Sequence, residues 1–156
     1  YYDWDGDGIP NWWEARFSRS GSKTDLDAST DDDADGMSNY GEFVAYTNPT
    51  NDNSKFTIAI APVVAEQPTS DIRQPKMMAA GRRLSNVAGS ANFALKWQSA
   101  QGRIYSVYAT PNLSEGWPET PTAEIVGTGD VLEYVPEQTA AVQFFKVSVR
   151  LVRENR

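Results

Sequence analysis

The chain has 156 residues, and its composition excludes several kinds of chemistry before any motif is considered. It contains no His and no Cys, so disulfide bonds, thiol chemistry and the usual zinc ligands are absent. The formal net charge is −7, and residues 1–50 hold eleven Asp and Glu against three Lys and Arg. A surface of that sign repels a polyanion, so we expect no nucleic-acid partner.

Two twelve-residue segments near the N-terminus share one pattern. Residues 3–14 and residues 31–42, which lie 28 positions apart, both read D-x-D-x-D-G-x-x-N-x-x-E. This is the spacing of the EF-hand type of calcium loop, in which alternate carboxylates point inward and a glycine at position six permits a sharp turn. Four carboxylates in one loop repel one another without a cation. We therefore predict at least two bound Ca²⁺ ions, one in each loop.

The predicted ligands follow the EF-hand order in both loops. They are the side chains at positions one, three and five, the carbonyl at seven, the amide at nine directly or through water, and the carboxylate at twelve. These positions are Asp3, Asp5, Asp7, Ile9, Asn11 and Glu14 in the first loop, and Asp31, Asp33, Asp35, Met37, Asn39 and Glu42 in the second. Magnesium prefers octahedral sites that retain several waters, so calcium is the expected ion.

Two more carboxylates, Asp25 and Asp27, lie between the loops. They are either additional ligands that bridge to the second loop or plain turn and capping residues, and both interpretations stay open.

A short amphipathic helix is expected after each loop. Pro10 suits the first position of a helix over about residues 10–19. A second helix is expected to be capped by Ser38 or Asn39 and to stop before Pro49. Because neither loop-helix unit alone can bury its aromatic face, we expect the two units to pack as a pair.

The first third of the chain resembles known calcium-binding repeats. Residues 1–52 contain, in order, D-W-D-G-D-G-I-P-N-W-W-E, T-D-L-D, D-D-D-A-D-G-M-S-N-Y-G-E-F and T-N-P-T-N. This succession is similar to thrombospondin type 3 repeats and to the related dockerin-type duplicated loop-helix modules, in the version found near the C-termini of large bacterial cell-surface proteins. The resemblance implies an extracellular or cell-surface segment that calcium makes rigid. The cohesin partner of dockerins is not carried over, because the helix-face residues that would bind it are not identified here.

From Phe56 onward the hydrophobic period changes to two, which predicts strands. The expected strands cover residues 56–61, 93–97, 104–109, 123–126, 131–135 and 142–152, with 93–109 forming a hairpin. Along the last strand, Phe145, Val147, Val149 and Leu151 are expected to face inward. Six or seven short strands between turn signals predict an antiparallel β-sandwich. The succession L-K-W and then G-R-I-Y-S-V-Y is similar to the second and third strands of fibronectin type III-like domains, a resemblance that concerns the fold alone.

The predicted organisation is a calcium-binding module over residues 1–52 and a β-sandwich domain over residues 53–156. Residues 66–91 show no sustained period, and a segment of that length within a domain is normally functional, disordered or a linker. We expect a long irregular insertion or exposed arm there.

The function expected from these features is structural and non-catalytic. With no His or Cys, and with no G-x-S-x-G or S-x-x-K motif, nothing predicts an enzyme. The chain is expected to serve a cell-surface protein or an extracellular fibre, with calcium as ligand and with neighbouring copies, joined by strand complementation, or another surface protein as partner. The alternative is a dockerin-like or carbohydrate-binding recognition module of a secreted enzyme. No apolar run approaches the ~20 residues that a membrane span needs.

Five aromatic residues of the predicted sandwich carry an open alternative. They either stack on sugars or pack in the core and at its rim; they are Trp97, Tyr105, Tyr108, Trp117 and Tyr134.

Overall fold

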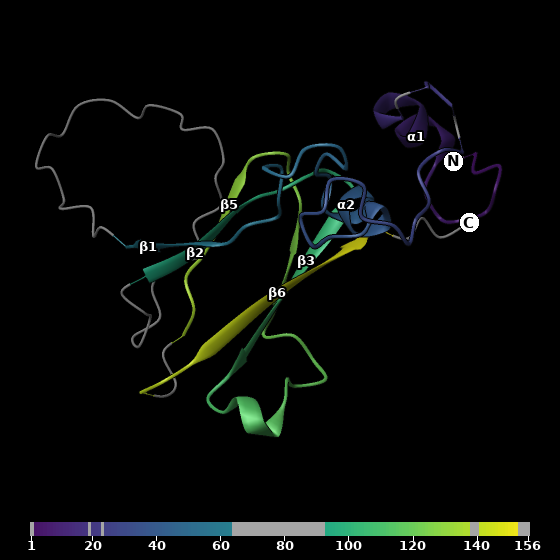
Figure 1. Cartoon of the computed structure of the whole chain (residues 1–156). Coiled ribbons are helices and arrows are strands. Elements are labelled where there is room, and N and C mark those ends of the chain that lie inside the picture. Colours follow the sequence, from purple (N-terminus) through teal and green to yellow (C-terminus); the bar gives the residue numbers. More distant parts are fainter. Residues whose placement is uncertain (1, 19, 23, 64–92, 138–140, 153–156) are drawn as a thin grey trace, which may run out of the picture.

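A computed structural model describes residues 2–18, 20–22, 24–63, 93–137 and 141–152 of the chain (Figure 1). The predicted insertion at residues 66–91 lies outside the described residues. The described chain contains helices α1 (Asn11–Phe17) and α2 (Asn39–Ala45), a 3₁₀ turn (Leu113–Glu115), and strands β1 (Ala59–Pro62), β2 (Phe93–Gln98), β3 (Arg103–Thr110), β4 (Ala123–Val126), β5 (Val131–Tyr134) and β6 (Phe144–Leu151). Neither of the two helices has the length and apolar character that crossing a bilayer requires.

Both helices follow their loops as predicted, but each has only seven residues. The prediction of residues 10–19 for the first helix was too long. Pro10 is the N-cap in extended conformation rather than the first helical residue, and Ser18 returns to extended backbone after Phe17. The second helix begins as predicted, because the Ser38 side chain accepts a hydrogen bond from the backbone N–H of Gly41 at 3.2 Å.

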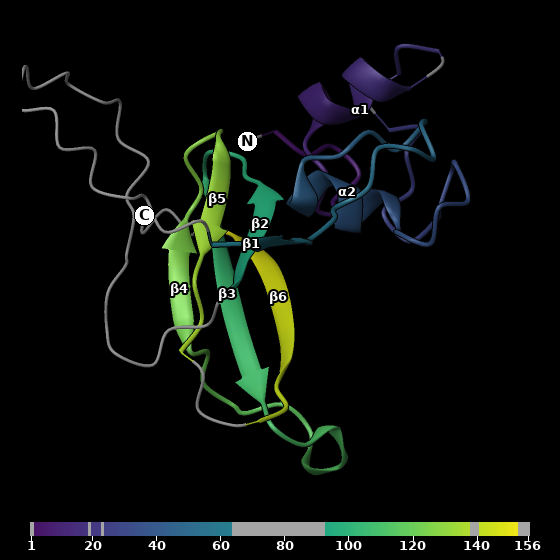
Figure 2. The same cartoon turned by 90° about the vertical axis from the view of Figure 1, so that its left-hand side faces the viewer.

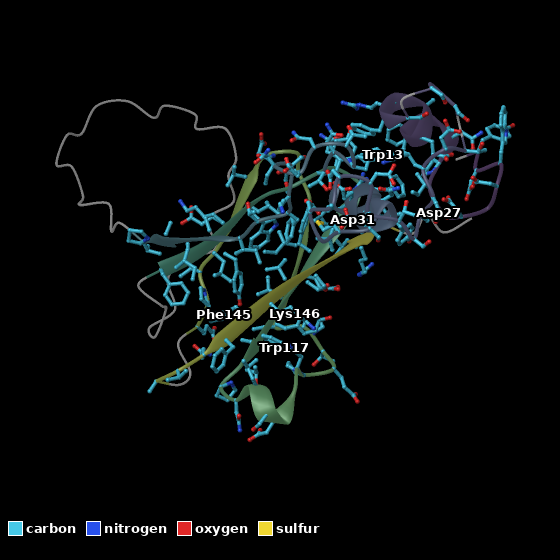
Figure 3. The ribbon with its side chains drawn as sticks, viewed as in Figure 1. Trp13, Asp27, Asp31, Trp117, Phe145 and Lys146 are labelled. Carbon is cyan, nitrogen blue, oxygen red and sulfur yellow. The ribbon has the colours of Figure 1, made fainter. Side chains whose placement is uncertain are left out.

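The two loop-helix units bury one shared cluster, formed by Ile9, Trp13, Leu26 and Phe43. Trp13 is 1% exposed and lies at its centre, between the two helices (Figure 3). Its ring contacts that of Phe43 edge to face, with 5.5 Å between the ring centroids. The cluster takes residues from both units, so the helices pack as the predicted pair.

The six strands form two antiparallel sheets, ordered β1-β2-β5 and β4-β3-β6. Figure 2 shows β3 lying between β4 and β6. The prediction of a hairpin over residues 93–109 was therefore wrong, because β2 and β3 belong to different sheets. A buried side chain stabilises the turn between them, because the Tyr105 hydroxyl accepts a hydrogen bond from the Ala100 N–H at 2.8 Å.

A second hydrophobic cluster takes residues from both sheets. Its buried members are Leu95 and Trp97 of β2 and Tyr105 and Val107 of β3. β2 and β3 thus face each other across this cluster instead of lying side by side, since both carry large apolar side chains on their inward faces.

The last strand confirms its four predicted inward residues, since all of them pack against a hydrophobic cluster. Phe145, Val147 and Val149 pack against the second cluster, whereas Leu151 packs against the first, near the helices. β6 therefore contacts both clusters. Helix α2 lies beside its C-terminal end (Figure 1).

The first strand begins later than predicted, at Ala59 instead of residue 56. Phe56 leaves the strand and stacks on the ring of Tyr105, with centroids 6.0 Å apart. Ile60 is 71% exposed on this short edge strand.

Packing explains the aromatic residues for which two roles were open. Trp97 and Tyr105 are each at most 2% exposed, and Tyr134 packs against the same cluster. Tyr108 and Trp117 lie against the ammonium group of Lys146, which is 4.4 Å and 5.1 Å from their ring centroids (Figure 3). Three of the five residues thus pack in or against the core, and the other two contact Lys146.

Arg103, the first residue of β3, joins the helical part to the sheets. It is 9% exposed, and its Nη2 and Nε donate to the carbonyls of Phe43 and Val44 at 2.8 Å and 3.2 Å. These carbonyls lie in the last turn of α2, where helical carbonyls lack partners within the helix and the helix dipole favours a cation. The guanidinium also lies 4.8 Å from the ring centroid of Tyr46. One buried side chain thus stabilises the end of α2 and the start of β3 together.

We expect Arg103→Met to lower the free energy of unfolding by about 2 kcal/mol or more, because buried carbonyls lose their charged donor. Urea denaturation in the presence of calcium measures this change. The control is Arg150→Met, since Arg150 is exposed and pairs with Glu124 at the surface, and its loss should cost less than ~1 kcal/mol. Equal urea midpoints for the two variants would contradict the role given to Arg103.

Candidate metal sites

The two predicted loops adopt the same backbone conformation. The glycine at position six has a φ of +97° in Gly8 and +98° in Gly36, which side-chain-bearing residues rarely adopt. Position four is also left-handed in both loops, with a φ of +76° at Gly6 and +62° at Ala34. The sequence repeat is therefore a structural repeat.

Each loop holds its aspartates in a tight group. Three carboxylates in each loop offer oxygens that all lie within 4.8 Å of one another; they come from Asp3, Asp5 and Asp7, and from Asp31, Asp33 and Asp35. Backbone donors fix the first aspartate of each loop in the same way. The Gly8 N–H donates to Asp3 Oδ2 at 3.0 Å, and the Gly36 N–H donates to Asp31 Oδ2 at 2.9 Å.

The glutamate at position twelve of each loop is fully buried. Glu14 and Glu42 are both 0% exposed, and each lies within the helix that follows its loop. Neither carboxylate oxygen of Glu14 has a hydrogen-bond partner, nor does Oε2 of Glu42. Oε1 of Glu42 accepts a weak hydrogen bond from the Thr47 hydroxyl at 3.2 Å. A buried carboxylate without partners is costly, so both groups call for a cation or a proton.

Burial and the loop aspartates raise the pKa of both glutamates. The pKa of Glu14 rises from 4.5 to about 7, first because of burial and then because of the negative charges of Asp5 and Asp7. The Leu26 N–H opposes this rise, although it lies outside normal hydrogen-bond geometry to the carboxylate. The pKa of Glu42 also rises to about 7, from burial and from the charge of Asp33. Each glutamate thus belongs electrostatically to the acidic group of its own loop.

Two aspartates of the second loop also have a buried oxygen without a hydrogen bond, although Lys55 Nζ lies 3.9 Å from Oδ2 of Asp35. Oδ2 of Asp33 and Oδ2 of Asp35 are buried and accept no hydrogen bond. Oδ1 of Asp35 accepts from the Met37 N–H at 2.8 Å, and in the first loop Oδ1 of Asp7 accepts from the Ile9 N–H at 2.7 Å. One oxygen of each position-five aspartate therefore fixes the backbone at position seven.

The asparagine at position nine of each loop accepts a hydrogen bond from the backbone N–H at position two of the same loop. Asn11 Oδ1 accepts from the Trp4 N–H at 2.9 Å, and Asn39 Oδ1 accepts from the Asp32 N–H at 3.4 Å. Both residues are buried. Their contacts explain why an amide suits this position, and their role as calcium ligands stays a prediction.

Asp25 and Asp27 make turn contacts outside the two acidic groups. Asp25 accepts hydrogen bonds from the hydroxyls of Ser18 and Ser20, and Asp27 accepts from the backbone N–H and the hydroxyl of Ser29. These bonds lower the pKa of both aspartates. Of the two open interpretations, the observed contacts are those of turn residues.

Three long-range contacts of the acidic loops were not predicted from the sequence. The Ala28 N–H donates to Asp7 Oδ2 at 2.9 Å, across 21 residues. The Tyr40 ring lies so near Gly8 that a β-carbon there would meet it at 3.1 Å. Lys55 Nζ donates to the carbonyl of Asp35 at 3.0 Å. No sequence pattern marks these residues, because each contact joins distant parts of the chain.

Comparisons with known proteins add no further constraint. No family model matches the sequence, and neither the curated proteins nor the solved structures contain a match to it.

In the presence of a chelator, we expect the stability of the fold to decrease between pH 5 and pH 8. Glu14 and Glu42 have a pKa of about 7 in the folded chain against 4.5 as the ordinary value, so the folded chain binds their protons more tightly. Their protonation stabilises the fold below pH 4.5, and this contribution is lost as the pH rises through 7. The loss should be on the order of 2 kcal/mol for each group.

Thermal unfolding of the chelated protein at several pH values measures this trend. The double variant Glu14→Gln/Glu42→Gln is the control, because it retains the shape of both side chains and removes both titrations. An identical pH profile for the variant and the unchanged chain would show that the two buried carboxyl groups do not titrate as described.

Proposed function

We propose that this chain is a non-catalytic structural module that binds two calcium ions, one in each acidic loop. The observation that carries the proposal is the pair of fully buried glutamates, Glu14 and Glu42, whose oxygens lie almost without partners beside three converging aspartates. A divalent cation would compensate these charges in a site made only of oxygen atoms. Calcium fits such a site, because it accepts six to eight oxygen ligands in flexible geometry.

The residues that would hold each ion are the three aspartates and the glutamate of its loop, with the carbonyls of Ile9 and Met37 as further oxygen donors. The ion's binding energy would become folding energy, since the acidic groups converge only in the folded chain. Glu42 lies in the same helix as Phe43 and Val44, whose carbonyls bind Arg103. An ion that fixes the second loop would therefore also fix α2, and through the hydrogen bonds of Arg103 it would stabilise the start of β3.

This arrangement supports a module whose shape depends on calcium. Loops of this kind in extracellular modules bind calcium at about 10⁻⁴–10⁻³ M, so the module would work at the cell surface or outside the cell. We propose that residues 1–52 form a unit of the thrombospondin type 3 or dockerin-like kind, and that the two sheets form a fibronectin type III-like sandwich. The shared cluster between the sheets supports the second assignment. Exposed edge strands such as β1 support assembly with further copies by strand addition.

We expect calorimetric titration of calcium into the chelator-stripped chain to give two ions per chain. Glu14→Gln should weaken the first site at least about tenfold and leave the second less affected, because a bidentate carboxylate ligand is lost from one loop. Glu42→Gln should show the reverse. The control is Glu133→Gln, since Glu133 pairs with Lys96 at the surface, far from the loops in sequence. Unchanged binding by both loop variants would contradict the proposal.

Removal of calcium should unfold residues 1–52 while most of the β-structure remains. Trp13 is buried in the cluster that the two loop-helix units form together, so EDTA should shift tryptophan emission to longer wavelength. The far-ultraviolet circular dichroism of the strands should change little in the same titration. An emission spectrum that EDTA leaves unchanged would count against a calcium-dependent fold.

A further inference from the structure

A cleft of about 640 Å³ lies between the calcium-loop part and the sheets. Trp12 of α1 and Tyr46 at the end of α2 line one side, and Gln98 and Gln101 near the turn after β2 line the other. The connecting segment that contains Asn53 also lines it. The volume falls in the range of sites that take small organic ligands, and the cleft belongs to neither acidic loop.

The lining of the cleft combines aromatic rings with neutral polar groups. Trp12 and Tyr46 are large aromatic residues that remain 41% and 46% exposed. Among the described residues that line the cleft there is no carboxylate, whereas there are amides and hydroxyls, on Asn53, Gln98, Gln101, Thr47, Ser54, Thr57 and Ser99. Such a lining offers flat apolar faces and hydrogen bonds at the same time.

The two cationic residues of the cleft already have partners. Lys55 Nζ donates to the carbonyl of Asp35 and lies 3.9 Å from its carboxylate. Arg103 donates to three carbonyls, at 2.8 Å, 3.0 Å and 3.2 Å. Because these interactions compensate both charges, an acidic ligand would compete with the Asp35 carboxylate and with backbone carbonyls for these two cations.

Tyr46 has a backbone conformation that favours glycine. Its φ of 66° costs roughly 1 kcal/mol for a residue with a side chain. The strain is compensated by contacts of the ring, which lies 5.3 Å from the ring centroid of Trp13 and under the guanidinium of Arg103. An aromatic ring is thus held in the lining of the cleft at a position where glycine would relax the backbone.

We infer that this cleft binds a neutral saccharide. Pyranose rings present a C–H face that packs on aromatic rings, and their hydroxyls pair with amide and hydroxyl groups. An apolar ligand would cover the polar groups of the lining without pairing with them, and an acidic ligand would find both cations already engaged. The inference deepens the proposed function and rests on it, because the calcium-binding part supplies Trp12 and Tyr46.

The test is binding of the full chain, in millimolar calcium, to a panel of immobilised neutral oligosaccharides built from glucose, mannose, xylose or N-acetylglucosamine. At least one should bind, and Trp12→Ala and Tyr46→Gly should each weaken its binding about tenfold or more. Gln101→Ala should weaken it as well; its side chain is exposed and makes one hydrogen bond, to the Thr128 carbonyl, so the fold is retained. The matched control is Tyr2→Ala, since Tyr2 is 84% exposed and does not line the cleft.

Two results would overturn the inference. One is that no neutral oligosaccharide of the panel binds although calorimetry shows both calcium sites filled. The other is binding that Trp12→Ala and Gln101→Ala leave unchanged, or that occurs only when sulfated or uronic saccharides are added to the panel. If calcium itself does not bind, the proposed function fails, and saccharide binding by the calcium-free chain then tests the cleft separately.

Discussion

The structure depends on two glutamates that are buried with almost no hydrogen-bond partners. Glu14 and Glu42 each lie inside a short helix, and the same helix supplies the aromatic residues of the first cluster. Each of these helices therefore buries a carboxylate as well as aromatic side chains. A carboxylate in that position needs a proton or a cation, and three aspartates beside it make a cation the better solution near neutral pH. If the proposed function holds, folding of this part of the chain and binding of a divalent ion are two aspects of one equilibrium.

The link between the two parts of the molecule follows from the shortness of the helices. A seven-residue helix has almost as many unpaired carbonyls as paired ones, so its end needs an external donor. Arg103 supplies that donor from the first residue of β3 and is itself buried by the contact. Leu151 of β6, which is paired with Arg103 at the same end of the sheet, packs on the first cluster. The sheets therefore supply a hydrogen-bond donor and an apolar side chain to the helical part. The cleft is lined by residues of the helical part and of the sheets.

Much of the candidate site was predictable from sequence because its determinants are local. A twelve-residue loop contains its own ligands and its own turn glycine, and Gly8 and Gly36 adopt the predicted conformation. The strands were predictable from their period of two, and their extents were close to those observed. Their pairing was not, because Leu95 and Tyr105 face a common core equally well as neighbours or across it. Arg103, Lys55 and Tyr40 also escaped prediction, since each acts on a partner far away in sequence.

The most direct measurement is a crystal structure of the chain grown in millimolar calcium, with anomalous scattering used to locate the ions. The account predicts one anomalous peak in each loop, within about 2.6 Å of both carboxylate oxygens of Glu14 in the first and of Glu42 in the second. Each peak should also have the three aspartates of its loop as neighbours. The central claim would be contradicted if neither loop contained an anomalous peak while both glutamates were still buried.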